Sequence, residues 1–250
     1  MARAPRSQKT ELPFFQLFPN LVTLAAICAG LTAIRFAFQG RIEFAVWLIV
    51  LAGVLDAIDG RLARALKSES DLGAELDSLA DFLNFGVAPA LTLYAWTLAE
   101  PRGAGWIAVL IYAICCVMRL ARFNVGIKSP DGGDKGFFTG VPAPAGALLV
   151  LFPIFATKSV EGWPVIPREA ISFYMILVGG LMISRLPTFS LKTVKVRADH
   201  ARYILVAVVA ALAALVTYPW VTLFVADILY MLGLVVAFVQ WRRNRNVPKG

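Results

Sequence analysis

The sequence predicts an all-α fold, a polytopic bundle of about eight transmembrane helices. Of its 250 residues, 59% are hydrophobic and only 16% are charged, and the mean hydropathy is +0.72. Apolar stretches of about 20 residues recur along the chain, and basic residues gather in alternate connections between them. These three observations favour a membrane protein over a soluble domain.

The apolar stretches predict the positions of the helices in order. Lipid offers the backbone no hydrogen-bonding partner, so a segment that crosses the hydrocarbon core satisfies its polar groups internally, as a helix does. The run 140–144 contains Gly and two Pro residues, which predicts a bent start for the fifth helix. We expect spans at residues 20–38, 44–66, 73–98, 105–124, 143–157, 170–185, 202–217 and 221–240.

Basic residues predict the side of the membrane that each connection faces. With the amino terminus inside, 19 of the 24 Lys and Arg residues fall on the cytoplasmic side, as the positive-inside rule requires. We therefore expect both termini in the cytoplasm and the protein in the cell (inner) membrane. These loops also account for the net charge of +8 without nucleic acid as a partner. Residues 1–250 are expected to form one membrane domain, with 1–19 as a cytoplasmic or interfacial segment and no cleaved signal peptide.

Four aspartates lie inside the second and third predicted spans, where each is costly. A carboxylate at the centre of a membrane helix costs about 2.5–3.5 kcal/mol. Asp56 and Asp59 are three residues apart, and Asp77 and Asp81 are four apart, so each pair shares one helix face. A short connection makes the two helices antiparallel neighbours, and their acidic faces can meet. Four carboxylates in one small volume require a cation.

The residue types around the acids indicate which cation would bind. Oxygen ligands with no His or Cys nearby suit a hard ion, Mg²⁺ or Mn²⁺, and four carboxylates can hold two such ions against a diphosphate. The alternative is that the acids form salt bridges with Arg61, Arg64 or Lys67, or belong to a solvated helix end.

Small and polar neighbours complete a possible ligand site. Gly60, Ala63 and Gly73 leave room for a ligand or a facing backbone, Arg64 can pair with phosphate oxygens, and Ser70 adds a hydroxyl. A cation-coupled transporter would also place acids in its helices, but it would not need these small residues at these spacings.

The acids and their neighbours form a pattern, Asp56-x2-Asp59-Gly60-x2-Ala63-Arg64-x8-Gly73-x3-Asp77-x3-Asp81. This string resembles the complete signature of the CDP-alcohol phosphotransferase family. The resemblance implies a helical membrane fold, a homodimer, and metal ligation by the first three aspartates, with the fourth as a further ligand or as the catalytic base. It also implies a set of residues that bind the donor nucleotide, namely Asn20, Thr23, Gly60, Ala63, Arg64, Ser70 and Gly73.

Two other stretches, 119–124 and 138–147, resemble those of phosphatidylserine synthases. They imply transfer of the phosphatidyl group of CDP-diacylglycerol to the hydroxyl of L-serine, with release of CMP. The same signature also serves other acceptors, so glycerol 3-phosphate, an inositol compound and choline remain alternatives.

Four residues are candidates for binding the acceptor. Arg119 and Arg122 share a helix face, and a pair of guanidinium groups can hold the carboxylate of serine or the phosphate that is transferred. Asn124 can orient the amino group. Asn84 follows Asp77 by two helical turns and is expected on the same face, lining the acceptor pocket.

Overall fold

The computed structural model describes residues 17–66, 68, 70–99, 103–128, 138–184, 187–188 and 198–245. Residues 1–16 of the expected interfacial segment, and Lys67 of the salt-bridge alternative, lie outside these ranges. Nine α-helices, two π-helical stretches and two short strands follow in the described chain: α1 (Phe18–Phe38), α2 (Ile42–Leu66), α3 (Asp71–Asp81), η2 (Phe82–Val87), α4 (Ala88–Leu93), η3 (Tyr94–Leu98), α5 (Ala104–Lys128), β1 (Phe138–Thr139), α6 (Ala143–Ser159), α7 (Arg168–Ile183), β2 (Pro187–Thr188), α8 (Ala198–Thr217) and α9 (Pro219–Arg245).

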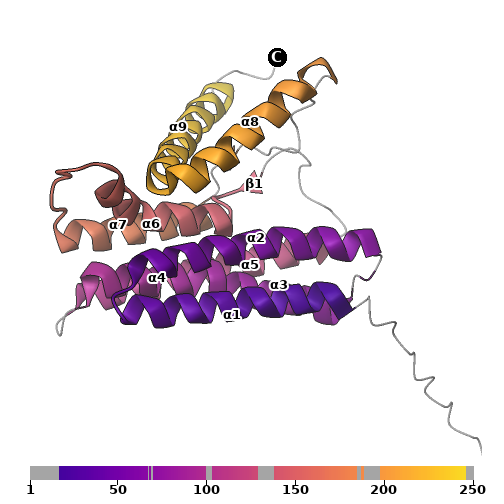
Figure 1. The fold of residues 1–250 in the computed structure, drawn as a ribbon, viewed down its shortest axis with the longest axis horizontal. Coiled ribbons are helices and arrows are strands. Elements are labelled where there is room, and N and C mark those ends of the chain that lie inside the picture. Colours follow the sequence, from indigo (N-terminus) through magenta and orange to yellow (C-terminus); the bar gives the residue numbers. More distant parts are fainter. Residues whose placement is uncertain are drawn as a thin grey trace, which may run out of the picture.

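The all-α prediction is confirmed, and each predicted span coincides with helical chain (Figure 1). Within the described residues, three helices are long and apolar enough to cross a membrane by length and composition: Phe18–Phe38, Ala104–Val125 and Pro219–Gln240. Figure 1 shows α6 and α7 between the group formed by α1 to α5 and the α8–α9 pair.

The third predicted span is one continuous helical segment that contains two π-helical stretches, η2 and η3. Ser70 begins it as the N-cap, and its Oγ accepts a 3.1 Å hydrogen bond from the amide of Gly73. Pro89 has no N–H, so the carbonyl oxygen of Phe85 lacks its usual helical donor. The hydroxyl of the buried Tyr112 donates to that oxygen at 2.9 Å. This hydrogen bond from α5 therefore stabilises the π-helical stretch η2. Because a π-helix has more residues per turn than an α-helix, the side chains after η2 point in other directions than a regular α-helix would give them.

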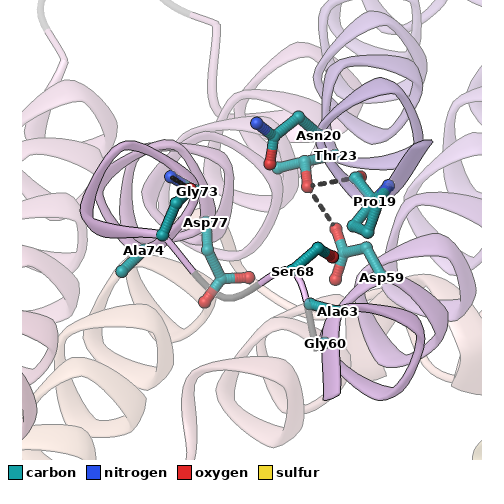
Figure 2. A pocket seen from close by; sticks show the side chains of 11 residues that line it. Pro19, Asn20, Thr23, Asp59, Gly60, Ala63, Ser68, Gly73, Ala74 and Asp77 are labelled. Atoms are coloured by element: carbon teal, nitrogen blue, oxygen red, sulfur yellow. Dashed lines mark hydrogen bonds between the residues drawn. The ribbon is translucent and has the colours of Figure 1, made fainter. Parts of the chain in front are cut away.

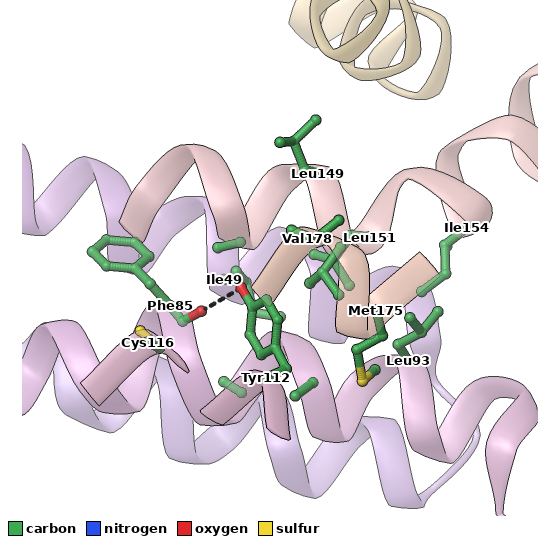
Figure 3. Close-up of a cluster of buried hydrophobic side chains, with 14 of the residues drawn as sticks. Ile49, Phe85, Leu93, Tyr112, Cys116, Leu149, Leu151, Ile154, Met175 and Val178 are labelled. Atoms are coloured by element: carbon green, nitrogen blue, oxygen red, sulfur yellow. Dashed lines mark hydrogen bonds between the residues drawn. The ribbon is translucent and has the colours of Figure 1, made fainter. Parts of the chain in front are cut away.

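The core lies where α2, α4, α5, α6 and α7 meet. Figure 3 shows buried apolar side chains from these helices, among them Ile49, Met175 and Val178 around Tyr112. The helices α5 and α7 approach closely because Gly179 has no side chain, and a Cβ there would lie 3.3 Å from the Cα of Tyr112. This core holds the helices that carry the polar residues of the site.

The chain turns sharply before α6, as the Gly- and Pro-containing run predicts. Gly140 has a φ of +85°, and β1 pairs with β2 just before it. A Cβ on Gly140 would lie 2.5 Å from the carbonyl oxygen of Met182 at the end of α7. This turn places the backbone of Val141 beside α5.

Candidate functional site

A pocket of about 240 Å³ opens between α1, α2 and α3 (Figure 2). It lies where α2 ends and α3 begins, so the chain between the two acidic helices forms part of its wall. Its lining is small and polar: Pro19, Asn20, Thr23, Asp59, Gly60, Ala63, Ser68, Ser70, Gly73, Ala74 and Asp77.

Asp59 is held in place by a residue of α1. The hydroxyl of Thr23 donates to Oδ2 of Asp59 at 2.7 Å and also lies 3.1 Å from the carbonyl oxygen of Pro19. Asp59 is only 3% exposed, and its other oxygen, Oδ1, is buried without a hydrogen-bond partner in the described part of the chain. One carboxylate oxygen is thus fixed by the protein and the other is left for a ligand.

Asp56, Asp59 and Asp77 converge as the motif predicts. Each offers one carboxylate oxygen, and these three oxygens lie within 4.8 Å of one another. Figure 2 shows the Asp77 carboxylate directed toward the space beside Asp59. Oδ1 of Asp56 is also buried without a partner among the described residues. Buried oxygens left unpaired beside a third carboxylate fit a hard divalent cation, so these residues suit the metal that the sequence predicts.

Asp81 lies beside this group and is not one of its three members. Its carboxyl is within hydrogen-bonding range of Asp56, and it interacts electrostatically with Asp77 and with Arg119. In the described part of the chain, none of the four aspartates is within salt-bridge distance of an Arg or Lys side chain. The salt-bridge alternative therefore has no support among the described residues.

The predicted donor-binding residues gather at the pocket, with one exception. Asn20, Thr23, Gly60 and Ala63 line it, as do Ser70 and Gly73. A Cβ on Gly73 would lie 3.0 Å from Oδ1 of Asn20, so glycine lets α1 and α3 approach. Arg64 is exposed and not part of the wall. Its Nε donates to the carbonyl oxygen of Gly60 at 2.9 Å, which places the guanidinium beside the pocket.

The predicted acceptor-binding residues of α5 lie outside this pocket. Arg119 is 9% exposed, and its Nε donates to the carbonyl oxygen of Val141 at 2.6 Å. Arg122 is exposed and donates to the carbonyl oxygen of Ile183 at 2.8 Å. These two bonds attach α5 to the chain around α6 and α7. Only Arg119 adjoins the acids, through Asp81.

The remaining two candidates make different contacts. The amide nitrogen of Asn124 donates to the hydroxyl of Ser78 on α3 at 2.9 Å. Asn84 is fully buried in η2, with neither amide atom hydrogen-bonded among the described residues, and it packs against Gly30 of α1. Because η2 is π-helical, the spacing of seven residues does not return Asn84 to the pocket wall beside Asp77.

The sequence motif did not identify three residues of the pocket wall, Pro19, Ser68 and Ala74. Ser68 is the most informative, because its Oγ is buried without a hydrogen-bond partner among the described residues. The available signal was its place in the short connection between the two acidic helices. A hydroxyl there faces any ligand that reaches both helices.

The fold and the site define a helical membrane protein with a carboxylate cluster beside a small polar pocket. A comparison with protein families matches residues 16–185 to the CDP-alcohol phosphatidyltransferase family. This match covers more than half of the chain and includes every site residue described above, and the chain belongs to this family.

Individual relatives agree with the family match. The chain is 41% identical to the CDP-diacylglycerol--serine O-phosphatidyltransferase of Mycobacterium leprae (strain TN) over 240 residues, covering 92% of this chain and 77% of the relative. It is 40% identical over 222 residues to the protein of that name from Mycobacterium tuberculosis (strain ATCC 25618 / H37Rv), covering 86% and 76%. The corresponding protein of Helicobacter pylori (strain ATCC 700392 / 26695) is 35% identical over 179 residues, covering 72% and 74%.

Proposed function

We propose that this protein transfers the phosphatidyl group of CDP-diacylglycerol to the hydroxyl of L-serine, giving phosphatidylserine and CMP. The observation that carries the proposal is the convergence of Asp56, Asp59 and Asp77 within 4.8 Å beside a small polar pocket. The names of the relatives, which specify serine, support serine as the acceptor.

The aspartate group is proposed to hold the metal, with Asp56, Asp59 and Asp77 as ligands and Asp81 either as a further ligand for a second ion or as the base. Carboxylate oxygens alone suit Mg²⁺ or Mn²⁺. When bound, such ions supply positive charge that offsets the charge of the diphosphate and of the departing CMP.

The residues of the pocket wall bind the donor in this proposal. Thr23 orients Asp59, while Asn20 and Ser68 offer an amide and a hydroxyl to the nucleotide phosphates or ribose. Gly60 and Gly73 keep the wall open, since any side chain there would narrow the pocket. Arg64, tied to Gly60, adds a guanidinium for a phosphate oxygen.

Asp81 is proposed to take the proton in the reaction. The serine oxygen forms a bond to the phosphorus next to diacylglycerol while the bond from that phosphorus to the CMP oxygen breaks. The hydroxyl proton passes to the Asp81 carboxylate, and CMP leaves with the bonding electrons. Asp81 suits this role because it adjoins the cluster through Asp56 without belonging to its three members.

The acceptor side is assigned to α5. Arg119 is proposed to bind the serine carboxylate, because it combines near-complete burial with proximity to Asp81. Arg122 and Asn124 are placed at the border of this acceptor site. Their hydrogen bonds to Ile183 and Ser78 hold the neighbouring helices in position there. For Asn84 a contact with the acceptor stays a prediction.

The proposal also covers the setting of the enzyme. We place it in the cell (inner) membrane as one domain over residues 1–250, with both termini and the active site cytoplasmic, because basic residues gather on that side. We expect a homodimer. Exposed apolar side chains on α8 and α9, such as Leu205, Leu212 and Leu229, offer surface for lipid or for a second copy.

Release of CMP tests the proposal. Purified protein is given CDP-diacylglycerol and a divalent metal, with L-serine, glycerol 3-phosphate, inositol, inositol phosphate and choline offered in separate reactions. Release that depends on serine supports the proposal. Release with a different alcohol would identify that alcohol, and not serine, as the acceptor. No release with any alcohol would reject phosphatidyl transfer.

A further inference from the structure

The acidic helix α3 carries a serine, Ser78, between two of the acids of the site. Ser78 directly follows Asp77 and precedes Asp81 by three residues. Its hydroxyl donates to the carbonyl oxygen of Ala74 at 3.0 Å and accepts a hydrogen bond of 2.9 Å from the amide nitrogen of Asn124 on α5. Ala74 belongs to the pocket wall. A chain of two hydrogen bonds thus runs from α5 through the acidic helix to the pocket.

The two ends of α3 are held by other contacts. At its start, Ser70 caps the helix, and Gly73 lets α1 approach closely. After its end, Tyr112 of α5 donates to the carbonyl oxygen of Phe85 in η2 at 2.9 Å. Between these points, Ala80 is the one residue of α3 that is buried. Few packed side chains therefore oppose a rotation of α3 about its axis, and a polar contact in this stretch has a larger effect.

The rotation of α3 decides where its carboxylates lie. Successive residues of an α-helix are about 100° apart around the axis, so a small rotation of the helix moves every side chain on it. Asp77 offers one of the three oxygens that lie within 4.8 Å of one another, and the other two come from Asp56 and Asp59 on α2. The three oxygens meet only while α3 keeps its orientation relative to α2. The bond to α5 fixes α3 at Ser78, the residue next to Asp77.

We infer that Asn124 is a positioning residue that holds α3 through Ser78 and thereby sets the metal affinity of the aspartate cluster. The inference rests on the proposed function, in which Asp77 is a metal ligand. It gives Asn124 a role other than the expected contact with the amino group of serine. One of the two N–H donors of its amide is committed to Ser78, and turning the side chain toward a ligand would break this bond.

Binding of Mn²⁺ to the purified protein tests the inference without turnover. Asn124→Ala removes the donor of the bond, and Ser78→Ala removes the acceptor. Groups that orient metal ligands typically contribute about 10- to 100-fold to metal affinity, so we expect the Kd for Mn²⁺ to rise about tenfold in each variant. An unchanged Kd in Asn124→Ala would overturn the inference.

The matched control is Ser159→Ala on α6. Like Ser78, Ser159 donates to a carbonyl oxygen four residues earlier in its own helix, that of Phe155 at 2.7 Å. Its loss removes the same kind of bond from a helix that carries none of the aspartates, so the Kd for Mn²⁺ should stay at the wild-type value. A rise as large as that in Ser78→Ala would overturn the inference, because it would show a general effect of losing a helical hydroxyl.

A double-mutant cycle tests whether the two residues act through one bond. If they do, the protein with both Asn124→Ala and Ser78→Ala has a Kd for Mn²⁺ within about twofold of that of either single variant. Effects that multiply would overturn the inference. Ser78→Thr keeps a hydroxyl and should bind Mn²⁺ within about twofold of wild type, whereas an affinity as weak as that of Ser78→Ala would count against the bond. Should Asn124→Ala fail to fold, Asn124→Leu enters the same cycle with the same expected outcomes.

Kinetics separate positioning of the acids from contact with the acceptor. At saturating Mn²⁺ we expect Asn124→Ala to keep the KM for serine within about twofold of wild type. A raised KM for serine with an unchanged Kd for Mn²⁺ would overturn the inference and assign Asn124 to the acceptor. A wild-type protein that binds Mn²⁺ but releases no CMP rejects phosphatidyl transfer alone, since the Kd values of the variants still decide the role of Asn124.

Discussion

The hydroxyl of Thr23 donates a 2.7 Å hydrogen bond to Oδ2 of Asp59 and thereby joins α1 to the helix that carries two of the four aspartates. Asp59 is buried, so this bond fixes one oxygen of its carboxylate while Oδ1 remains unpaired among the described residues. The first helix thus orients one carboxylate of the aspartate cluster without contributing a carboxylate of its own.

Thr23→Val tests this arrangement, because valine has nearly the same shape and no hydroxyl. Groups that orient metal ligands typically contribute about 10- to 100-fold to metal affinity or activity. We expect the metal concentration for half-maximal CMP release to rise about tenfold. The control is Thr32→Val on the same helix, whose exposed hydroxyl bonds only the carbonyl oxygen of Cys28. A similar shift in both variants would contradict the role of Thr23.

Asp77→Asn should have opposite effects on activity and stability. Removing one of three clustered carboxylates should lower CMP release about 100-fold or more, because the metal loses a ligand. Without metal the same change relieves repulsion among like charges, so thermal unfolding in chelator should occur at a higher temperature. Glu43→Gln is the control, since Glu43 lies at the other end of α2 and pairs with Lys158 on the surface at 2.7 Å. Loss of both activity and stability in Asp77→Asn would count against a metal cluster.

Gly30→Ala should destabilise the bundle, because a Cβ on Gly30 would overlap Oδ1 of Asn84. Overpacking of this kind costs about 1–3 kcal/mol. Thermal unfolding in detergent measures it, with Gly180→Ala as the control at an exposed helical glycine that has open space around it. Adding Asn84→Ala should restore part of the lost stability. A Gly30→Ala protein as stable as Gly180→Ala would show that α1 and η2 do not pack as described.

Two glycines with positive φ form a matched pair. Gly140 (φ +85°) and Gly162 (φ +74°) both have a backbone that disfavours alanine, but only Gly140 is crowded, since a Cβ there would lie 2.5 and 2.8 Å from the carbonyl oxygens of Met182 and Ser184. We expect Gly162→Ala to cost about 1 kcal/mol from backbone strain alone and Gly140→Ala to cost more. Gly140→Ala should also raise the KM for serine, because the turn positions Val141 beside Arg119. Thermal unfolding measures both losses of stability. Equal losses in Gly140→Ala and Gly162→Ala would contradict the crowding at Gly140.

The periodicity and hydropathy of the chain were sufficient to predict the eight helical regions, and the motif spacing was sufficient to predict the convergence of Asp56, Asp59 and Asp77. Both follow from nearby sequence, since residues three or four apart share one face of a helix and a short connection makes the two acidic helices neighbours. The capping of α3 by Ser70 is another local feature, although the sequence suggested only a ligand contact for it.

The rest depends on contacts between helices that are distant in sequence. The π-helical winding around Phe85 involves Tyr112 of α5 as a donor, so the sequence of the third span alone did not predict that Asn84 packs against Gly30 of α1. Contacts between residues so far apart in the chain produce no regular spacing in the sequence from which they could be predicted.

The most direct test of the central claim is the incorporation of labelled L-serine into phosphatidylserine by the purified protein. CDP-diacylglycerol is supplied with Mg²⁺ or Mn²⁺, and parallel reactions contain a chelator or the Asp81→Asn variant. This variant should fold normally because it replaces a single carboxyl oxygen by an amide nitrogen of similar size. We expect labelled lipid in the wild-type reaction only, together with an equal amount of CMP. Undiminished product with Asp81→Asn would contradict its role as the base, and metal-dependent CMP release without labelled lipid would contradict serine as the acceptor.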